Sequence, residues 1–230
     1  MSRKLSKRLS AIADMVDKGA YLADVGSDHA LLPIELVERG TIDWAMAIDN
    51  KIGPFLRMKE AVDQKKLSAH IICSKSDGIS EINESVDTLA ICGMGGLLAI
   101  KILEEGKRKL PQIKSIILDP HRDLVKVRTA VVSMGFKIQD ETLVYEDKIH
   151  YVIMKFVKGT PTSPYTNADI LLGPILRQKR EPLFLEWLEI QRKHLSDLLN
   201  KNLSGEARQR YLALYRVVRD ELRCQPSLDK

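Results

Sequence analysis

The fold is decided by the stretch Tyr21-Leu-Ala-Asp-Val-Gly-Ser-Asp-His-Ala-Leu-Leu-Pro33, in which an apolar run ends at a glycine and a second apolar run follows. Residues 21–25 predict a strand and residues 31–39 predict a helix. Gly26 lets the backbone turn tightly between them and approach a ligand closely, because no Cβ stands in the way. The stretch therefore predicts the first β–α unit of an open sheet, where ligands bind beyond the carboxyl ends of the strands.

Similar units follow along the chain. Further strands are predicted over residues 44–48, 69–73, 88–92, 115–118, 137–144 and 150–156, and helices over residues 5–16, 54–65, 96–110 and 123–134. Strands that alternate with helices favour a mostly parallel sheet covered on both faces. The gap between the last two strands is too short for a crossover helix, so they should pair as an antiparallel hairpin. Seven strands with a terminal hairpin resemble the plan of a Rossmann-like methyltransferase domain.

The chain changes character at Gly159-Thr-Pro-Thr-Ser-Pro164, a stretch with two prolines and no apolar period. We therefore predict an α/β domain over residues 1–159 and a helical domain over residues 160–230. In the second domain, helices over residues 182–203 and 206–223 would form an antiparallel hairpin, a coiled-coil arm. This arm could pack as an appendage or grip a substrate.

The composition is that of a globular protein with a buried core. The chain has 230 residues, of which 44% are hydrophobic and 29% charged, so disordered and collagen-like classes are excluded. Cys73, Cys92 and Cys224 are far apart and lack metal-ligand spacing, so we expect neither a disulfide framework nor a metal site. No signal peptide and no apolar stretch of about 20 residues is visible, which predicts a soluble cytoplasmic protein. The net charge of +5 permits a nucleic-acid partner without requiring one.

The loop after the first predicted strand carries Asp28 and His29 but only one of the three glycines of a dinucleotide fingerprint. A pyrophosphate there would meet a carboxylate, which is electrostatically unfavourable and argues against a nicotinamide oxidoreductase. The loop suits a cofactor with a cationic portion better. Alternatively, Asp28 could simply cap the following helix.

Polar and glycine residues also follow the other predicted strands. Asp49 lies 25 positions beyond Asp24, a distance at which an acidic residue can hydrogen-bond a ribose, and Asn50 could assist. Asp77 and Gly78 would lie near an adenine base. The run Ile91-Cys-Gly-Met-Gly-Gly96 brings backbone groups close to a bound molecule, and His121 and Arg122 after the fifth strand could face a substrate.

Five motifs resemble the bacterial tRNA (adenine-N1)-methyltransferase family that modifies adenosine 22 of tRNA. They are Asp24-Val-Gly-Ser-Asp-His-Ala-x-Leu-Pro33, Ile48-Asp-Asn50, Ser76-Asp-Gly78, Ile91-Cys-Gly-Met-Gly-Gly96 and Leu171-Leu-Gly-Pro-Ile-Leu176. The resemblance spans nearly the whole chain. It implies a class I S-adenosylmethionine-dependent enzyme whose cofactor would be held by Asp24, Gly26, Ser27, Asp49, Asn50, Asp77, Gly78, Cys92, Gly93, Met94 and Gly95.

Two departures from common patterns accompany the resemblance. Many amino-methyltransferases carry an Asn/Asp-Pro-Pro-aromatic motif after the fourth strand, and Gly93-Met-Gly-Gly96 stands in its place here. Asp119-Pro120 stands where we expect Gln-Pro. The usual explanation of how the target base is gripped therefore does not transfer to this chain.

The implied reaction needs alignment more than proton transfer, because adenine N1 has a free lone pair at neutral pH. A carboxylate near the exocyclic amine would stabilise the cationic product base, and Asp28 is the first candidate and His29 the second. Asp28 could instead hold the ammonium group of the cofactor.

A folded tRNA must present the base flipped out, and its phosphates would contact Arg3, Lys4, Lys7 and Arg8. We expect a monomer. Two alternatives are a methyltransferase acting on a protein or small-molecule amine, and a non-catalytic RNA-binding protein that retains the fold.

Overall fold

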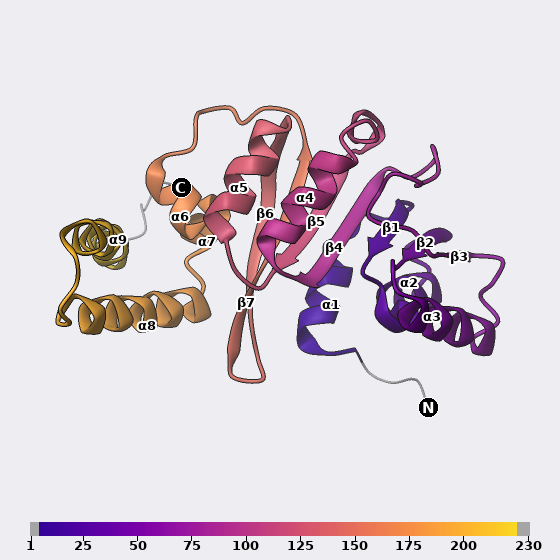
Figure 1. Ribbon diagram of the computed structural model, residues 1–230, viewed down its shortest axis with the longest axis horizontal. Coiled ribbons are helices and arrows are strands. Elements are labelled where there is room, and N and C mark those ends of the chain that lie inside the picture. The colour runs from indigo at the N-terminus through magenta and orange to yellow at the C-terminus, as the bar shows by residue number, and fades with distance from the viewer. Residues whose placement is uncertain (1–4, 225–230) are drawn as a thin grey trace. The chain divides into compact units, whose positions relative to one another are not determined.

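The computed structural model describes residues 5–224 (Figure 1). Its strands are β1 (Tyr21–Val25), β2 (Trp44–Ile48), β3 (Ile71–Ser74), β4 (Thr88–Met94), β5 (Ser115–Pro120), β6 (Phe136–Glu146) and β7 (Ile149–Lys158). The helices before the tail are α1 (Lys7–Asp14), α2 (Leu31–Glu38), α3 (Ile52–Gln64), α4 (Gly96–Glu105) and α5 (Leu124–Ser133). Every predicted strand is confirmed, with ends shifted by a few residues.

The strands form one seven-stranded sheet of order β3-β2-β1-β4-β5-β7-β6. The first five strands are parallel, whereas β7 is antiparallel to β5 and to β6. The predicted terminal hairpin is thus confirmed. Its two-residue turn is formed by Asp147 and Lys148, whose φ angles of 50° and 64° match the left-handed conformation that tight hairpins prefer.

Helices α1, α2 and α3 pack on one face of the sheet. Ile12 of α1 and Leu36 of α2 share a fully buried cluster with Leu22 of β1, and Met58 of α3 lies in the adjoining cluster with Ile71 of β3. Helices α4 and α5 pack against each other and lie together in front of the sheet in Figure 1. The predicted covering of a parallel sheet by helices is therefore observed.

The helix that we predicted over residues 96–110 is shorter than expected. It ends at Glu105, and Gly106 follows as its C-cap. A Cβ at Gly106 would lie 2.1 Å from the side chain of Ile79, so the chain needs a glycine where the helix stops. A short 3₁₀ turn over Leu110–Gln112 then leads into β5.

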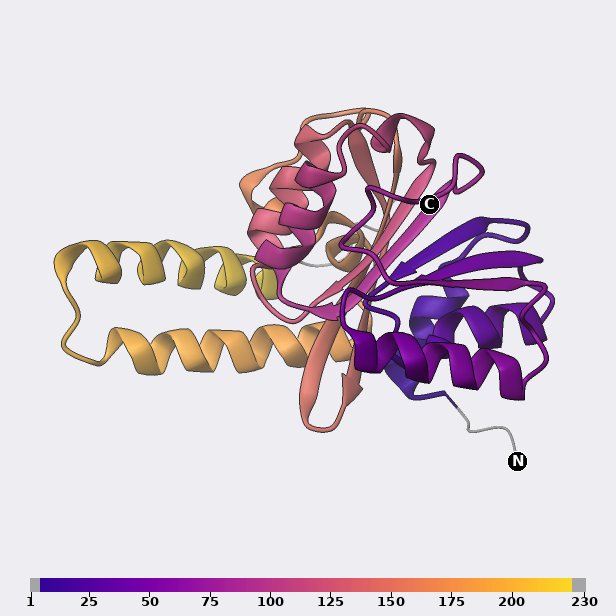
Figure 2. The same cartoon turned by 45° about the vertical axis from the view of Figure 1, so that its right-hand side comes forward.

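The chain divides into two compact units between Ser163 and Pro164. The second unit contains α6 (Asn167–Leu172), α7 (Pro174–Lys179), α8 (Pro182–Leu199) and α9 (Gly205–Arg223). Figure 2 shows α8 and α9 running side by side, joined by a short turn. The apolar side chains of Phe184, Leu188 and Leu195 in α8 and of Val218 in α9 are buried.

Helices α6 and α7 are not predicted from the sequence, because six residues are too few to show a helical period. A capping box marks the start of α6, where Thr166 and Asp169 exchange side-chain and backbone hydrogen bonds. Arg177 and Arg180 of α7 then hold the buried carboxylate of Glu221 in α9, each at 2.7 Å. No helix between Leu5 and Cys224 is long and apolar enough to cross a bilayer.

Candidate active site

A cleft of about 650 Å³ opens at the carboxyl ends of β1 and β4, between the loops that follow these strands and helix α1. Its lining brings together predicted residues from three separate segments. They are Arg8 from α1, Asp24 from β1 with Gly26, Ser27, Asp28 and His29 from the turn that follows it, and Cys92 and Gly93 from β4. Apolar side chains of α1 and α2 complete the wall. The position agrees with the rule that open parallel sheets bind ligands beyond the carboxyl ends of their strands.

The turn after β1 is bent by residues in the left-handed conformation. Gly26 has a φ of 79°, and a Cβ there would lie 3.0 Å from the Met94 methyl group. His29 and Ala30 have φ angles of 62° and 50°, although neither is a glycine. Such strained residues concentrate at functional sites, where the surrounding structure holds them in place.

Asp28 does not cap α2, so that alternative is wrong. The residue before the first turn of α2 is Ala30, and no side-chain capping bond is formed there. The Asp28 carboxylate instead accepts hydrogen bonds from Nε and Nη2 of Arg57 in α3, both at 2.9 Å. Arg57 was missed by sequence analysis, since a lone arginine inside a predicted helix carries no motif.

Asp24 and Ser27 place buried polar atoms at the bottom of the cleft. Asp24 forms no ion pair with any described residue, and burial raises the pKa of its carboxyl to about 6. The Ser27 hydroxyl opposes this pKa shift, although it makes no hydrogen bond of standard geometry to a described residue. A buried carboxylate and a buried hydroxyl without strong partners are costly unless a ligand supplies the missing interactions.

We expect Asp24→Asn to stabilise the ligand-free protein in a pH-dependent way. Because the folded-state pKa lies above the usual value of 3.8, folded Asp24 keeps its proton between pH 4 and 6 while the unfolded chain loses it. As the pH rises from 4 to 6, the unfolding free energy of the wild type should therefore fall by up to about 3 kcal/mol relative to that of the variant. Urea unfolding of both proteins at pH 4.5 and 7.5 measures this difference, and an equal difference at the two pH values would contradict the prediction.

The predicted residues after β2 and β3 lie outside the lining of this cleft. Asp49 directly follows β2, and its Oδ1 accepts a hydrogen bond from the Lys51 backbone N–H at 2.8 Å. The Asn50 amide donates to the Asp77 carboxylate at 3.1 Å, which ties the two loops together. Gly78 has a φ of 66°, so a glycine suits this turn.

Strand β4 ends in a bulge at Gly93, where the pairing with β5 shifts and φ is 73°. Gly95 follows in extended conformation as the N-cap of α4, and Met94 lies against Gly26. Burial raises the pKa of the Cys92 thiol well above its ordinary value of 9.0. Cys92 is therefore a neutral thiol at physiological pH and not a nucleophile.

The Arg8 guanidinium faces the cleft instead of extending freely into solvent. Its Nη1 lies 2.8 Å from Oδ2 of Asp119 and 3.2 Å from Nε2 of His121. Its Cζ lies 4.9 Å from the centre of the Tyr151 ring in β7. Asp119 is fully buried, its Oδ1 has no hydrogen-bond partner among residues 5–224, and burial raises its pKa in spite of Arg8.

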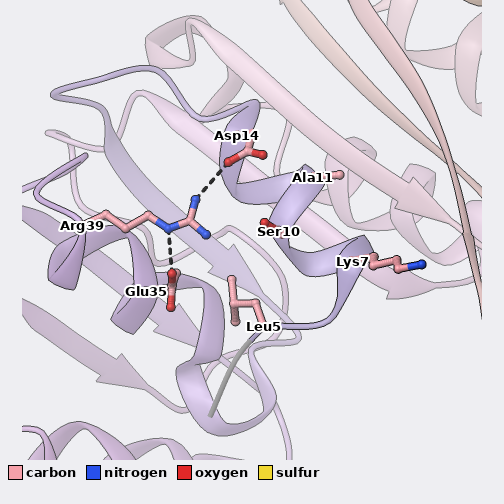
Figure 3. A pocket seen from close by; sticks show the side chains of 7 residues that line it. All are labelled: Leu5, Lys7, Ser10, Ala11, Asp14, Glu35 and Arg39. Carbon is pink, nitrogen blue, oxygen red and sulfur yellow. Dashed lines mark hydrogen bonds and ion pairs between the residues drawn. The ribbon is translucent and has the colours of Figure 1, made fainter. Parts of the chain in front are cut away.

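Of the other residues predicted to bind RNA, Arg3 and Lys4 lie outside the described residues. The Lys7 backbone N–H donates to Glu146 at 2.6 Å. In Figure 3 its side chain points away from the ion pairs between α1 and α2.

A second cleft of about 690 Å³ lies between α1 and α2 (Figure 3). Arg39 crosses it and pairs with Glu35 at 2.6 Å and with Asp14 at 2.9 Å. Because these carboxylates already hold a cation and no strand end reaches this cleft, its residues offer little to a cofactor. No cluster of three or more His, Cys, Asp or Glu side chains suited to a metal ion exists among residues 5–224.

The strand order, the antiparallel strand β7 between β5 and β6, and the cleft at β1 and β4 define a class I S-adenosylmethionine-dependent methyltransferase. The family model for tRNA (adenine(22)-N(1))-methyltransferase, TrmK, matches residues 22–222. The chain belongs to this family.

Three comparisons illustrate the similarity. The Bacillus subtilis tRNA (adenine(22)-N(1))-methyltransferase is 35% identical over 188 residues, which cover 80% of this chain and 79% of that protein. A Streptococcus pneumoniae relative crystallised with S-adenosyl-L-methionine is 33% identical, with a TM-score of 0.87 over 95% of this chain and 100% of that one. The crystal structure of B. subtilis TrmK is 28% identical, with a TM-score of 0.86 over 95% and 99% of the two chains.

Proposed function

We propose that this protein transfers a methyl group from S-adenosylmethionine to N1 of adenosine 22 in tRNA. The observation that carries the proposal is the cleft at the ends of β1 and β4, which is lined by Gly26, Asp28 and Gly93. The chain that forms this cleft belongs to the family named above. A tRNA substrate and a cytoplasmic location follow from the same proposal. The monomeric state stays a prediction.

The residues around the cleft fit the cofactor. Asp24 is a buried carboxylate without a cationic partner in the described part of the chain, and the ammonium group of the methionine portion would supply one. The Ser27 hydroxyl has no hydrogen-bond partner among the described residues, so it is available to the methionine portion of the cofactor. Gly26 has no Cβ, so its backbone can approach the same portion closely. We assign the ribose to Asp49 and Asn50, the adenine to Asp77 and Gly78, and the remaining contacts to the backbone of residues 92–95.

When bound, S-adenosylmethionine supplies an electrophilic methyl group, so the protein needs no base to activate adenine N1. The task of the chain is to align the base and to exclude water. Asp28 would accept a hydrogen bond from the exocyclic amine of the target base and balance the charge that forms on the ring. Nε and Nη2 of Arg57 both contact Oδ1 of Asp28 and hold the carboxylate, and His29, 3.8 Å from Asp28, stays the second candidate.

The tRNA would be held mostly through its phosphates, with the target base flipped out of its stack. We keep Arg3, Lys4 and Lys7 as candidate phosphate contacts. Arg8 differs from them, because its guanidinium is already engaged inside the cleft.

The proposal is tested by methylation of an unmodified tRNA transcript with labelled S-adenosylmethionine, followed by mass spectrometry of the nucleosides. We expect 1-methyladenosine with adenosine at position 22 and none when guanosine replaces it. Asp28→Asn should lower the turnover about 10- to 100-fold while cofactor binding persists.

The matched control for Asp28→Asn is Glu38→Gln, since Glu38 also pairs with a cation, Lys65, but at the far end of α2 from the cleft. It should methylate at the wild-type rate. Cofactor binding without methylation of any tRNA would overturn the proposal and favour a protein or small-molecule acceptor.

A further inference from the structure

The cleft has few side chains on which a flipped base can stack. Its lining contains no phenylalanine, tyrosine or tryptophan, and residues 93–96, at the end of β4 and the start of α4, have no aromatic side chain. Among the lining residues, only Arg8 and His29 carry a planar group of the required size. Proteins that hold unstacked RNA bases commonly stack them on aromatic rings or on arginine guanidinium planes.

Of these two groups, Arg8 is the one held in a fixed position. Asp119 and His121 contact the same atom, Nη1, and the Tyr151 ring lies on one side of the guanidinium. The edge of the His121 ring in turn packs against Tyr151, with 5.6 Å between ring centres. A Cβ at Gly93 would lie 3.7 Å from Nη1, so the guanidinium stands directly beside the glycine of the β4 bulge.

The support of Arg8 comes from the interior of the domain. Asp119 is fully buried on β5, whereas the Arg8 side chain is 26% exposed and reaches it from α1. An arginine that only served to meet a phosphate would not need a buried carboxylate, a histidine and an aromatic ring around it. Asp119 also neutralises much of the guanidinium charge, which lowers the repulsion between Arg8 and a base that becomes cationic on methylation.

We propose that Arg8, held against Tyr151 by Asp119 and His121, is the platform on which the target adenine stacks, in place of the aromatic side chain that is absent after β4. The inference rests on the proposed function, because it assigns the contact for the base in that reaction. It gives Asp119 a role as a positioning residue that acts through Arg8.

The decisive test compares Arg8→Ala with Arg8→Lys in single-turnover methylation of the tRNA at saturating cofactor. Lysine keeps the positive charge and can still pair with Asp119, but it has no plane for stacking. We expect the methylation rate to fall about 10- to 100-fold in both variants. The dissociation constants for S-adenosylmethionine and for tRNA should change less than about threefold, since phosphate contacts dominate RNA affinity.

Two further variants separate stacking from a merely structural role. Tyr151→Leu removes the ring behind the guanidinium and should lower the rate at least fivefold, whereas Tyr151→Phe keeps the ring and should retain more activity. Lys18→Ala, which removes an exposed cation beyond the end of α1, is the control for general charge loss. Thermal unfolding of each variant reports whether α1 remains in place.

The outcomes are distinct. If Arg8→Lys methylates within threefold of the wild type, Arg8 acts as a charge and the stacking platform is overturned. If Arg8→Ala fails to fold, Arg8→Lys and Tyr151→Leu still decide between the two roles. If the wild type itself does not methylate adenosine 22, the proposed function is wrong, and the assignment of Arg8 as a stacking platform is wrong as well.

Discussion

Glu141→Ala should lower the free energy of unfolding by about 4 kcal/mol, the largest effect that we expect from a single substitution. Arg128 of α5 and Glu141 of β6 form an ion pair at 2.8 Å, with side chains that are 1% and 0% exposed. Removing the carboxylate takes a close counter-charge away from a buried guanidinium, which costs far more than the loss of one hydrogen bond. Urea unfolding monitored by circular dichroism measures the change.

Two further variants test whether this loss of stability comes from the buried ion pair. Glu105→Ala removes one partner of the exposed Lys101–Glu105 pair, whose side chains are 65% and 64% exposed, and should cost less than about 1 kcal/mol. The double variant Arg128→Met/Glu141→Leu should recover most of the lost stability, because apolar residues of similar volume replace both charges. A loss below 1 kcal/mol for Glu141→Ala would show that the pair is not needed to hold α5 on the sheet.

Gly96→Ala should destabilise the protein by about 3 kcal/mol and weaken cofactor binding with it. A Cβ at Gly96 would lie 2.5 Å from the backbone oxygen of Arg122, 2.7 Å from Val127 and 3.1 Å from Asp123. Because one of these atoms belongs to the backbone, no side-chain rotation relieves the clash. The start of α4 and the loop after β5 must move apart, and residues 92–95 move with them. The midpoint of thermal unfolding should fall by roughly 6–12 °C.

The neighbouring glycine is the matched control. Gly95 has a φ of −69°, and its added Cβ would meet only the Arg122 side chain, at 3.5 Å. Gly95→Ala should therefore cost no more than about 1 kcal/mol, the difference between glycine and alanine at an N-cap. Equal effects of the two substitutions would mean that the packing of α4 against α5 does not depend on Gly96.

Local patterns determined the strands, the hairpin and much of the site. Short, mainly apolar runs marked the five parallel strands, because a strand buried on both faces needs such a run. The turns at Gly26 and at residues 92–96 were visible for a similar reason, since glycine is the residue that a close backbone approach requires. The sequence therefore placed Asp28, His29 and Gly93 near one another without any knowledge of distances.

Only the tertiary structure decided which charged groups meet. Arg8 and Asp119 are 111 residues apart, and Asp28 and Arg57 are 29 apart, so no spacing within one helix or strand connects them. Sequence analysis assigned Arg8 to RNA phosphates and left Asp119 without a role. The contact between them exists because α1 packs on the sheet at the ends of β4 and β5. An ion pair of this kind depends on how distant elements pack together, whereas a turn or a strand depends mainly on consecutive residues.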